Sequence, residues 1–259
     1  MISWLIVAYC FFLIIHHRYY WVSNLKEWHN IPGDEFIAHR GLKTKHPENT
    51  IHAYLDAVEN NFSWLEVDIV STKDNVIVCS HNFDLERETE CVGYIHEMSY
   101  NEFNFNNIRK YGDKESIYKI PMLDEVLERI PSNIGINLEI KTSTVFDLST
   151  ARAFKNIKRK CMGRPYFVSS FNPIVLFYFK IFYRDVPIGF LLESEKLQWL
   201  TNWIHPTVLI PRADMLKTEL FKFCSSKNLP IYTWTVNNKV AIEWCKTKNI
   251  LGIITDIEK

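Results

Sequence analysis

Short apolar runs alternate with amphipathic segments along most of this chain. Residues Trp64–Val70 alternate apolar and acidic positions, which is the period of a strand. Asp147–Lys160 instead has the spacing of a helix. On this basis we predict strands at Glu35–His39, Trp64–Val70, Val76–Ser80, Ile134–Ile140, Tyr166–Ser169, Pro187–Leu191, Val208–Ile210, Ile231–Trp234 and Gly252–Thr255. We predict helices at Thr50–Asn60, Met122–Arg129, Asp147–Lys160, Pro173–Phe182, Asp214–Lys227 and Lys239–Thr247.

The order of these elements indicates the fold class. Repeated strand–helix units without a glycine-rich nucleotide fingerprint favour a parallel β/α barrel of the TIM type over a dinucleotide-binding sheet. Residues 84–120 lack clear periodicity, and we predict that they lie outside the main sheet. The expected architecture is therefore an α/β barrel with a short insertion after the second strand region.

The N-terminus begins with an uninterrupted apolar run, Ile2–Ile15. As a helix it would span only about 21 Å, whereas a hydrocarbon core is about 30 Å thick. A cleaved signal peptide is disfavoured because no basic residue precedes the run and bulky aromatics follow it. An apolar helix packed on the domain remains an alternative. We favour an uncleaved membrane anchor, with Tyr19, Tyr20 and Trp21 at the level of the lipid headgroups.

The basic residues Arg18 and Lys26 lie only on the C-terminal side of the run, which favours a cytoplasmic, membrane-associated catalytic domain. The predicted organisation is a hydrophobic segment at 1–22, a linker at 23–34 and a barrel domain at 35–259. The formal net charge is zero, with Lys+Arg 30 and Asp+Glu 30. A balanced charge argues against a protein that binds nucleic acid through a broad basic surface.

Several polar side chains lie within predicted strands or directly after them. Glu66 and Asp68 are one residue apart, so both would point to the same face of a strand. Two such carboxylates repel each other unless a cation lies between them, and a hard divalent ion fills that role. Glu139 ends another strand and could complete a cradle of three carboxylates, while Lys141 could contact a phosphate oxygen.

Two histidines, His39 and His81, also end predicted strands. One imidazole could take a proton from an attacking oxygen while the other gives a proton to a leaving alkoxide. Arg40 could hold two phosphate oxygens in a bidentate clamp. Gly41 is compatible with a simple turn or with close approach of the backbone to a ligand. The side chains of Pro47–Thr50 are expected to brace the rim rather than to perform chemistry.

Taken together, these motifs resemble the glycerophosphodiester phosphodiesterase family, which belongs to the barrel class of phosphatidylinositol-phospholipase-C-like phosphodiesterases. The resemblance runs from about Phe36 to Asp256. The motifs that carry it are His39-Arg40-Gly41, Pro47–Thr50, Glu66-x-Asp68, Thr72-x-Asp74, Ser80-His81 with Leu85 and Arg87, Ile120-Pro121, Leu123-x-Glu125-Val126-Leu127, Asn137–Lys141, Ser170-Phe171, Trp234–Asn237 and Gly252–Asp256.

The resemblance implies a cofactor and roles for individual residues. It implies a divalent cation, Ca²⁺ or Mg²⁺, at Glu66, Asp68 and Glu139. It implies that His39 and His81 form the acid–base pair and that Arg40 and Lys141 lie near the phosphate. Phe171 and Trp234 match rim aromatics that could line the pocket for the alcohol group, although barrel packing would explain them equally well.

The implied reaction is the splitting of glycerophosphodiesters into glycerol 3-phosphate and an alcohol. An alternative is lysophospholipase D-like hydrolysis of lysophospholipids at a membrane, which the N-terminal segment motivates. A third possibility is a catalytically silent barrel that acts as a binding module. One position departs from the family pattern, because the family usually has aspartate after the second histidine and this chain has Asn82.

Overall fold

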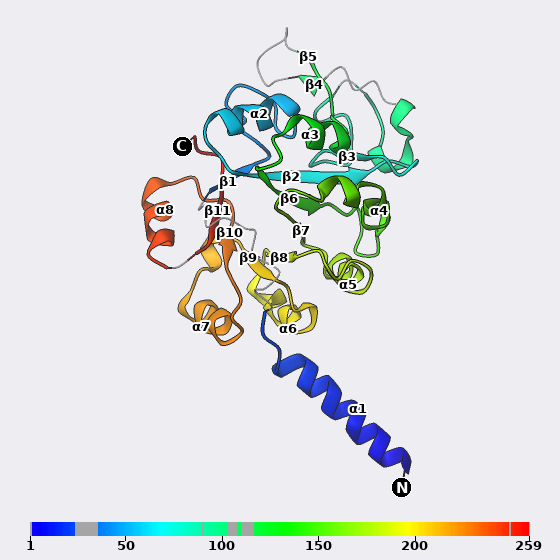
Figure 1. The fold of residues 1–259 in the computed structure, drawn as a ribbon, viewed down its shortest axis with the longest axis vertical. Coiled ribbons are helices and arrows are strands. Elements are labelled where there is room, and N and C mark those ends of the chain that lie inside the picture. Colours follow the sequence, from blue (N-terminus) through cyan, green and yellow to red (C-terminus); the bar gives the residue numbers. More distant parts are fainter. Residues whose placement is uncertain are drawn as a thin grey trace.

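Eight parallel strands form a closed barrel in the computed structural model, which describes residues 2–23, 36–89, 91–102, 108–109, 117–248 and 250–258 (Figure 1). The strands are β1 (Phe36–His39), β2 (Trp64–Ser71), β6 (Gly135–Ile140), β7 (Tyr166–Ser170), β8 (Ile188–Leu192), β9 (Val208–Pro211), β10 (Tyr232–Thr233) and β11 (Gly252–Thr255). Hydrogen bonding follows the order β10-β11-β1-β2-β6-β7-β8-β9. Parallel bridges between Leu209 and Ile231 and between Arg212 and Trp234 join β9 to β10 and close the ring.

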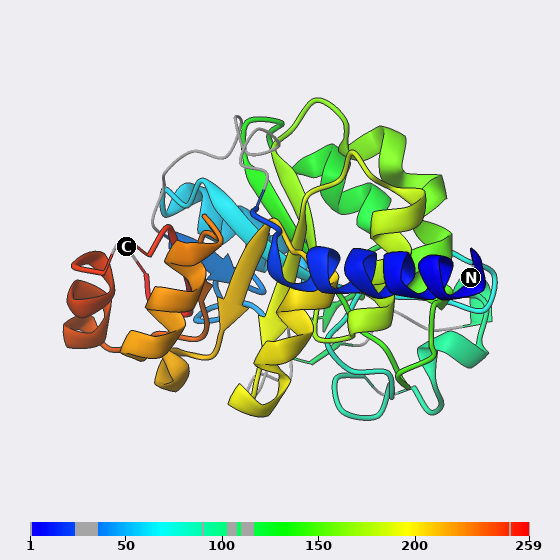
Figure 2. The same ribbon diagram turned by 90° about the horizontal axis from the view of Figure 1, so that it is seen from below.

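The helices surround this barrel on the outside (Figures 1 and 2). They are α2 (Ile51–Glu59), α3 (Leu123–Arg129), α4 (Ser149–Cys161), α5 (Pro173–Phe182), α6 (Thr201–Ile204), α7 (Thr218–Ser226) and α8 (Lys239–Lys246), with 3₁₀ turns η4 (Glu195–Leu200) and η5 (Ala213–Met215). Local sequence sets several helix starts: the Thr50 hydroxyl accepts from the Ala53 N–H, and Asn172 and Asn238 cap α5 and α8 in the same way. The predicted barrel with its outer helices is confirmed.

Alternation along the strands separates two apolar cores. Residues such as Leu65 and Val67 point outward and pack with helix residues, among them Tyr54 and Phe154. The intervening positions point inward and form a smaller cluster, which we call the barrel floor; it consists of Ile37, Trp64, Phe167, Leu191, Val208, Ile210, Tyr232 and Ile254. Gly135 makes room for Trp64, because a Cβ atom at this position would lie 2.3 Å from the indole ring.

The insertion begins with a hairpin that doubles back on β2. Strand β3 (Ile77–Cys79) pairs with β2 in antiparallel register, with Cys79 opposite Ile69. It is followed by the 3₁₀ turns η2 (Ile95–Glu97) and η3 (Tyr100–Glu102) and by the short antiparallel strands β4 (Ile108–Arg109) and β5 (Ile117–Tyr118). The predicted strand at Val76–Ser80 is therefore present, but it is a return strand outside the barrel.

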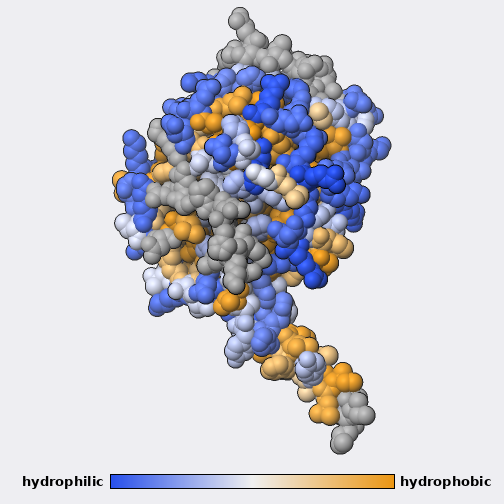
Figure 3. Space-filling view, in the orientation of Figure 1, coloured by the Kyte–Doolittle hydropathy of each residue, from blue (hydrophilic) through white to orange (hydrophobic). Residues whose placement is uncertain are grey.

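The N-terminal helix α1 (Ile2–Tyr19) extends away from the barrel, and it is longer than the apolar run that predicted it (Figure 1). Most of its apolar side chains, including Trp4 and Phe11, are exposed, as the orange surface along it shows (Figure 3). No helix in the described part of the chain is long and apolar enough to span a membrane. Membrane association of this segment stays a prediction.

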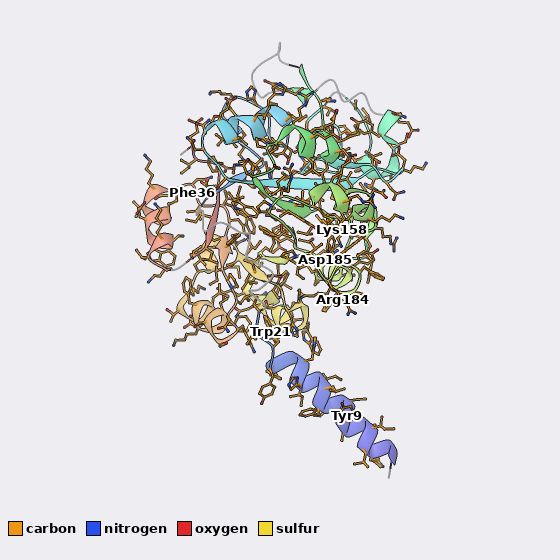
Figure 4. The ribbon with its side chains drawn as sticks, viewed as in Figure 1. Tyr9, Trp21, Phe36, Lys158, Arg184 and Asp185 are labelled. Atoms are coloured by element: carbon orange, nitrogen blue, oxygen red, sulfur yellow. The ribbon has the colours of Figure 1, made fainter. Side chains whose placement is uncertain are left out.

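The base of α1 is packed against α6 (Figure 4). The His17 ring lies 4.1 Å from that of His205, and Trp21 is buried with its indole N–H donating to Asn202 at 3.0 Å. Trp21 was expected at the headgroup level with Tyr19 and Tyr20, and that placement is wrong. The free length of α1, which carries Tyr9, does not pack along the barrel (Figure 4). The predicted linker at 23–34 lies, apart from Ser23, outside the described residues.

Candidate active site at the barrel mouth

At the carboxyl ends of the barrel strands, the residues that point into the barrel are polar. His39 follows Ile37 by two residues in β1, and Glu66 follows Trp64 by two in β2. Residues two apart in a strand share a face, so the same face that forms the floor carries these polar groups at the mouth. In a β/α barrel, this end of the strands is where active sites are found.

Three carboxylates meet at this mouth. Glu66, Asp68 and Glu139 each offer an oxygen, and these oxygens all lie within 4.8 Å of one another. All three residues are buried, with relative exposures of 1%, 0% and 6%. The register explains the meeting, because β2 and β6 are paired with Asp68 directly opposite Glu139.

Two cations border the carboxylates. The Lys141 ammonium lies 3.0 Å from Asp68 Oδ1 and also contacts Glu139. The Arg40 guanidinium lies 3.1 Å from Asp68 Oδ2 and donates to Glu48 at 2.7 Å. The structure brings both Arg40 and Lys141 to the carboxylates, and their predicted contact with a phosphate stays a prediction.

The charges of this group do not balance. Burial raises the pKa of Glu66, and the neighbouring Asp68 and Glu139 raise it further. Burial also raises the pKa of Glu139, against the effect of Lys141. Burial opposes ionisation of Asp68 too, but Lys141 and Arg40 outweigh it and lower its pKa to about 2. Three buried carboxylates thus face two cations, and ionisation of Glu66 is opposed by its burial and by both neighbouring carboxylates.

This arrangement fits a divalent cation. The buried Glu66 Oε1 atom has no hydrogen-bond partner among the residues that the structure describes. A buried carboxylate oxygen without a partner is costly unless a proton or a metal ion compensates it. Hard divalent ions take carboxylate oxygens as ligands, and the donor set here consists of three such groups.

A tight turn brings Arg40 to the carboxylates. Arg40 and Gly41 both have positive φ, at 59° and 79°, and the Arg40 N–H donates to Glu66 Oε2 at 2.9 Å. Gly41 is required by its neighbour rather than by a ligand, because a Cβ there would lie 2.6 Å from the backbone of Ala53. Of the two alternatives for Gly41, the structure therefore supports the turn.

Each of the two predicted histidines has a polar partner on Nδ1. His39 Nδ1 lies 2.8 Å from Asp256 Oδ1. His81 follows the return strand β3, and the Ser80 N–H donates to the Asp68 carbonyl at 3.1 Å, which brings His81 beside the carboxylates. Its Nδ1 lies 3.2 Å from Asn82 Oδ1. Burial, together with Lys141, lowers the pKa of His81.

Comparison with known proteins now identifies the family. The model of the glycerophosphoryl diester phosphodiesterase family matches residues 39–257. A glycerophosphodiester phosphodiesterase from Caldanaerobacter subterraneus subsp. tengcongensis is 30% identical over 225 residues, which are 85% of this chain and 93% of the relative. This chain belongs to the glycerophosphodiester phosphodiesterase family. It is accordingly a phosphoric diester hydrolase.

Two further comparisons are with a curated relative and with a solved structure. A human lysophospholipase D is 34% identical over 261 residues, covering 85% of this chain and 82% of that protein. A phosphodiesterase from Oleispira antarctica, solved in complex with its product sn-glycerol-3-phosphate, superposes with a TM-score of 0.79 at 22% identity and covers 87% of this chain and 94% of that one. This structural likeness confirms the predicted barrel.

The two aromatic residues predicted for the family's alcohol pocket lie together. The Phe171 and Trp234 rings are 5.3 Å apart in an edge-to-face arrangement and pack on top of the barrel floor. Lys141 Nζ lies 5.7 Å from the centroid of the Phe171 ring, so the pair borders the charged cluster. Both rings are only partly buried. One side of the aromatic pair therefore packs against the floor, and the other side is partly exposed at the mouth.

Several residues to which the sequence analysis assigned no chemical role hold this family site together. Asn49 accepts from the Tyr54 hydroxyl at 2.8 Å and donates to Asp68 at 2.9 Å. Asp256 binds His39, and Lys43 lies 3.0 Å from the same carboxylate oxygen. Alternation in β11 could have revealed Asp256, because Ile254 points into the floor and the residue two positions later points to the mouth.

Proposed function

We propose that this chain hydrolyses glycerophosphodiesters to glycerol 3-phosphate and an alcohol, with a divalent cation at Glu66, Asp68 and Glu139 and acid–base catalysis by His39 and His81. The observation that carries the proposal is the meeting of the three buried carboxylates, one of them with an unpartnered oxygen, at the mouth where both histidines lie. When bound, Ca²⁺ or Mg²⁺ would neutralise charge that develops on the phosphoryl oxygens.

The protein's own groups supply the proton transfers. A carboxylate only accepts hydrogen bonds, so the contact with Asp256 requires a proton on His39 Nδ1 and leaves Nε2 for the reaction. His81 Nδ1 faces an amide oxygen and is placed in the same way. One histidine would take the proton of the attacking hydroxyl, from water or from the glycerol itself, and the other would protonate the leaving alkoxide.

The remaining polar and aromatic groups would position the substrate. Arg40 and Lys141 present cationic groups beside the carboxylates, where they can bind phosphate oxygens. Phe171 and Trp234 would border the alcohol group. The product bound in the Oleispira antarctica phosphodiesterase, sn-glycerol-3-phosphate, supports this substrate class.

The second candidate is lysophospholipase D-like hydrolysis, favoured by the likeness to the human lysophospholipase D. The N-terminal segment motivated this candidate, because an anchor could hold the mouth near lipid. The way in which α1 is attached to the barrel weighs against that reason. Ser23 contacts the Thr207 carbonyl at 2.9 Å and the Lys227 carbonyl at 2.7 Å, and both residues precede barrel strands. The base of α1 therefore lies at the end of the barrel opposite the mouth.

Membrane association through residues 1–22, with the barrel domain at 35–259 on the cytoplasmic side, rests on the exposed apolar side chains of α1. It is tested by flotation with phosphatidylcholine vesicles, comparing the full chain with a Phe12→Asp variant. Equal partitioning of the two proteins into the aqueous phase would remove the proposal while leaving the reaction unaffected.

The reaction is tested with the full chain on glycerophosphocholine and on lysophosphatidylcholine, before and after exhaustive chelation. We expect turnover of the first substrate, loss of activity in chelator and recovery with Ca²⁺ or Mg²⁺. His39→Ala and His81→Ala should each reduce kcat by about a thousandfold while the protein still folds cooperatively. His16→Ala, on the exposed face of α1, is the matched control. Full activity after chelation, or in either active-site variant, would contradict the proposal.

A further inference from the structure

The two histidines at the mouth are held by different kinds of partner. His39 faces a carboxylate, which accepts hydrogen bonds through either oxygen. His81 faces the side-chain amide of Asn82, which presents an acceptor at one end and a donor at the other. Rotation of this amide by half a turn would place an N–H group against His81 Nδ1 and would favour the opposite tautomer. Something must therefore fix the amide.

Glu88 supplies that constraint. The Asn82 Nδ2 atom donates to Glu88 Oε1 at 2.6 Å. Because an ionised carboxylate only accepts, the amide nitrogen must face Glu88 and the amide oxygen must face His81. The amide oxygen in turn accepts the proton of His81 Nδ1 at 3.2 Å.

The insertion holds Glu88 in place for this contact. The N–H groups of Glu88 and Thr89 donate to the Leu85 carbonyl at 3.3 and 2.9 Å, forming a turn, and Leu85 is buried. The Ser80 hydroxyl donates to the Asn82 carbonyl at 2.8 Å and holds the other side of the contact. The carboxylate and the amide thus lie on short, hydrogen-bonded segments.

We propose that Glu88 is a positioning residue that acts through Asn82 to hold neutral His81 as the Nδ1–H tautomer, so that Nε2 is free to exchange protons with the substrate. The inference rests on the proposed function of His81 as an acid–base catalyst. It explains how an amide at position 82 can present His81 with a directed acceptor. The amide alone would not select the tautomer, whereas the amide with Glu88 does.

The charged groups around Glu88 set the conditions for a test. Burial raises the pKa of Glu88 to about 7, with a further contribution from Glu48, while Asn82 and Arg40 act in the opposite direction. Asp68 also raises it. Above this pH, Glu88 is ionised and can only accept. Measurements at pH 8.5 or above, about one and a half units higher, therefore examine the ionised form.

The kinetic test uses two positions. Glu88→Met removes the acceptor at similar length and should lower kcat for glycerophosphocholine about tenfold with little change in KM. Glu88→Gln keeps a carbonyl acceptor for the amide and should stay within about threefold of the wild type. The control is Glu86→Gln, an exposed position in the same segment, which should have no effect.

The decisive comparison repeats Glu88→Met in an Asn82→Asp background. An aspartate at position 82 accepts from His81 through either oxygen, so Glu88 is no longer needed for orientation. The tenfold loss should therefore shrink to about threefold or less, which a double-mutant cycle measures directly. If Glu88 only maintained the fold of the insertion, its replacement would cost the same in both backgrounds.

A spectroscopic measurement separates this inference from the proposed function. Nitrogen-15 chemical shifts of the His81 ring distinguish Nδ1–H from Nε2–H in the resting protein, without turnover. We expect Nδ1–H in the wild type, a mixture in Glu88→Met and a return to Nδ1–H in the double variant. An unchanged His81 tautomer in Glu88→Met, or an equal loss of kcat in both backgrounds, would overturn the proposed positioning role of Glu88. Full activity of His81→Ala would instead overturn the catalytic role itself.

Discussion

The floor and the mouth of the barrel interior are built from the same strands, yet they contain opposite kinds of side chain. In β1 the floor residue Ile37 is followed by His39 at the mouth, and in β11 Ile254 is followed in the same way by Asp256. The floor is apolar and densely packed, with the Trp64 and Phe167 rings 5.8 Å apart.

The mouth contains buried charges that repel one another. Glu66 and Glu139 have raised pKa values because of their burial, and such groups oppose folding when ionised. The floor and the outer core therefore supply hydrophobic stabilisation, while the mouth retains Glu66 and Glu139, whose ionisation opposes folding. Proteins commonly accept this local cost at functional sites. Substitutions at the mouth should therefore lower mainly kcat, and substitutions at the floor should lower mainly the free energy of unfolding.

The largest expected effect is at the centre of the mouth. Glu66→Gln removes a metal ligand but keeps an oxygen for the Arg40 N–H, so kcat should fall by at least about a thousandfold. The same substitution removes a buried carboxyl group whose ionisation is opposed by burial and by Asp68 and Glu139. Without metal ions, the variant should melt a few degrees above the wild type, at about 2 to 4 °C per kcal/mol for a domain of this size.

Differential scanning calorimetry with and without Ca²⁺ or Mg²⁺ measures the melting temperatures of the wild type and of Glu66→Gln in both conditions. The wild type should gain stability from the ion and the variant should gain little. A Glu66→Gln protein that melts lower than the wild type in chelator would show that the mouth carries no electrostatic cost.

An intermediate effect is expected at the partner of His39. Asp256→Asn keeps the size of the side chain but allows its amide to present a donor to His39 Nδ1. We expect a loss of about a hundredfold in kcat. Asn237→Ala is the control, because it removes the hydrogen bonds of Asn237 with the other oxygen and the backbone N–H of Asp256 and with the Thr255 hydroxyl, without replacing the partner of His39.

The Asp256 carboxylate should also affect how the free energy of unfolding depends on pH. Burial opposes ionisation of Asp256, but the contacts with His39 and Lys43 outweigh it and hold its pKa below the usual value. A group with a lowered folded pKa stabilises the fold above about pH 4 and loses that contribution as the pH falls. In urea titrations, the difference in the free energy of unfolding between the wild type and Asp256→Asn should therefore become smaller below about pH 4. A difference that does not change with pH would contradict the lowered pKa of Asp256.

The smallest effect is expected at the floor. Ile254→Val removes one methylene from a side chain that is 2% exposed and should lower the free energy of unfolding by about 0.5 to 1.5 kcal/mol. Because Ile254 lies in the floor and supplies no polar group to the mouth, kcat should stay within about twofold of the wild type. A large loss of turnover would mean that the floor also sets the geometry of the mouth.

Those parts of the molecule that depend on alternation along a strand could be predicted from the sequence. The pair Glu66 and Asp68 shares a face because the two residues are one apart, and the barrel follows from repeated strand–helix units. The gathering of Glu66, Asp68 and Glu139 within 4.8 Å was predicted for the same reason. Position along the strand and strand order are sufficient for these inferences.

Features that depend on the path of a loop could not be predicted in this way. His81 reaches the carboxylates because β3 returns antiparallel along β2, a direction that the apolar pattern of Val76–Ser80 does not encode. The contact between Asn82 and Glu88 depends on a turn at Leu85 within a segment without periodicity. The catalytic roles themselves stay predictions until the variants are measured.

The attachment of α1 has a practical consequence. Trp21 and Ser23 hold this helix to the amino-terminal ends of the barrel strands, across the full height of the barrel from the catalytic entrance. A bead, sensor surface or fusion partner joined ahead of Ile2 would therefore leave the entrance directed toward the bulk solution. Immobilisation through this end should preserve access for small diesters and for bulky aggregated lipids alike.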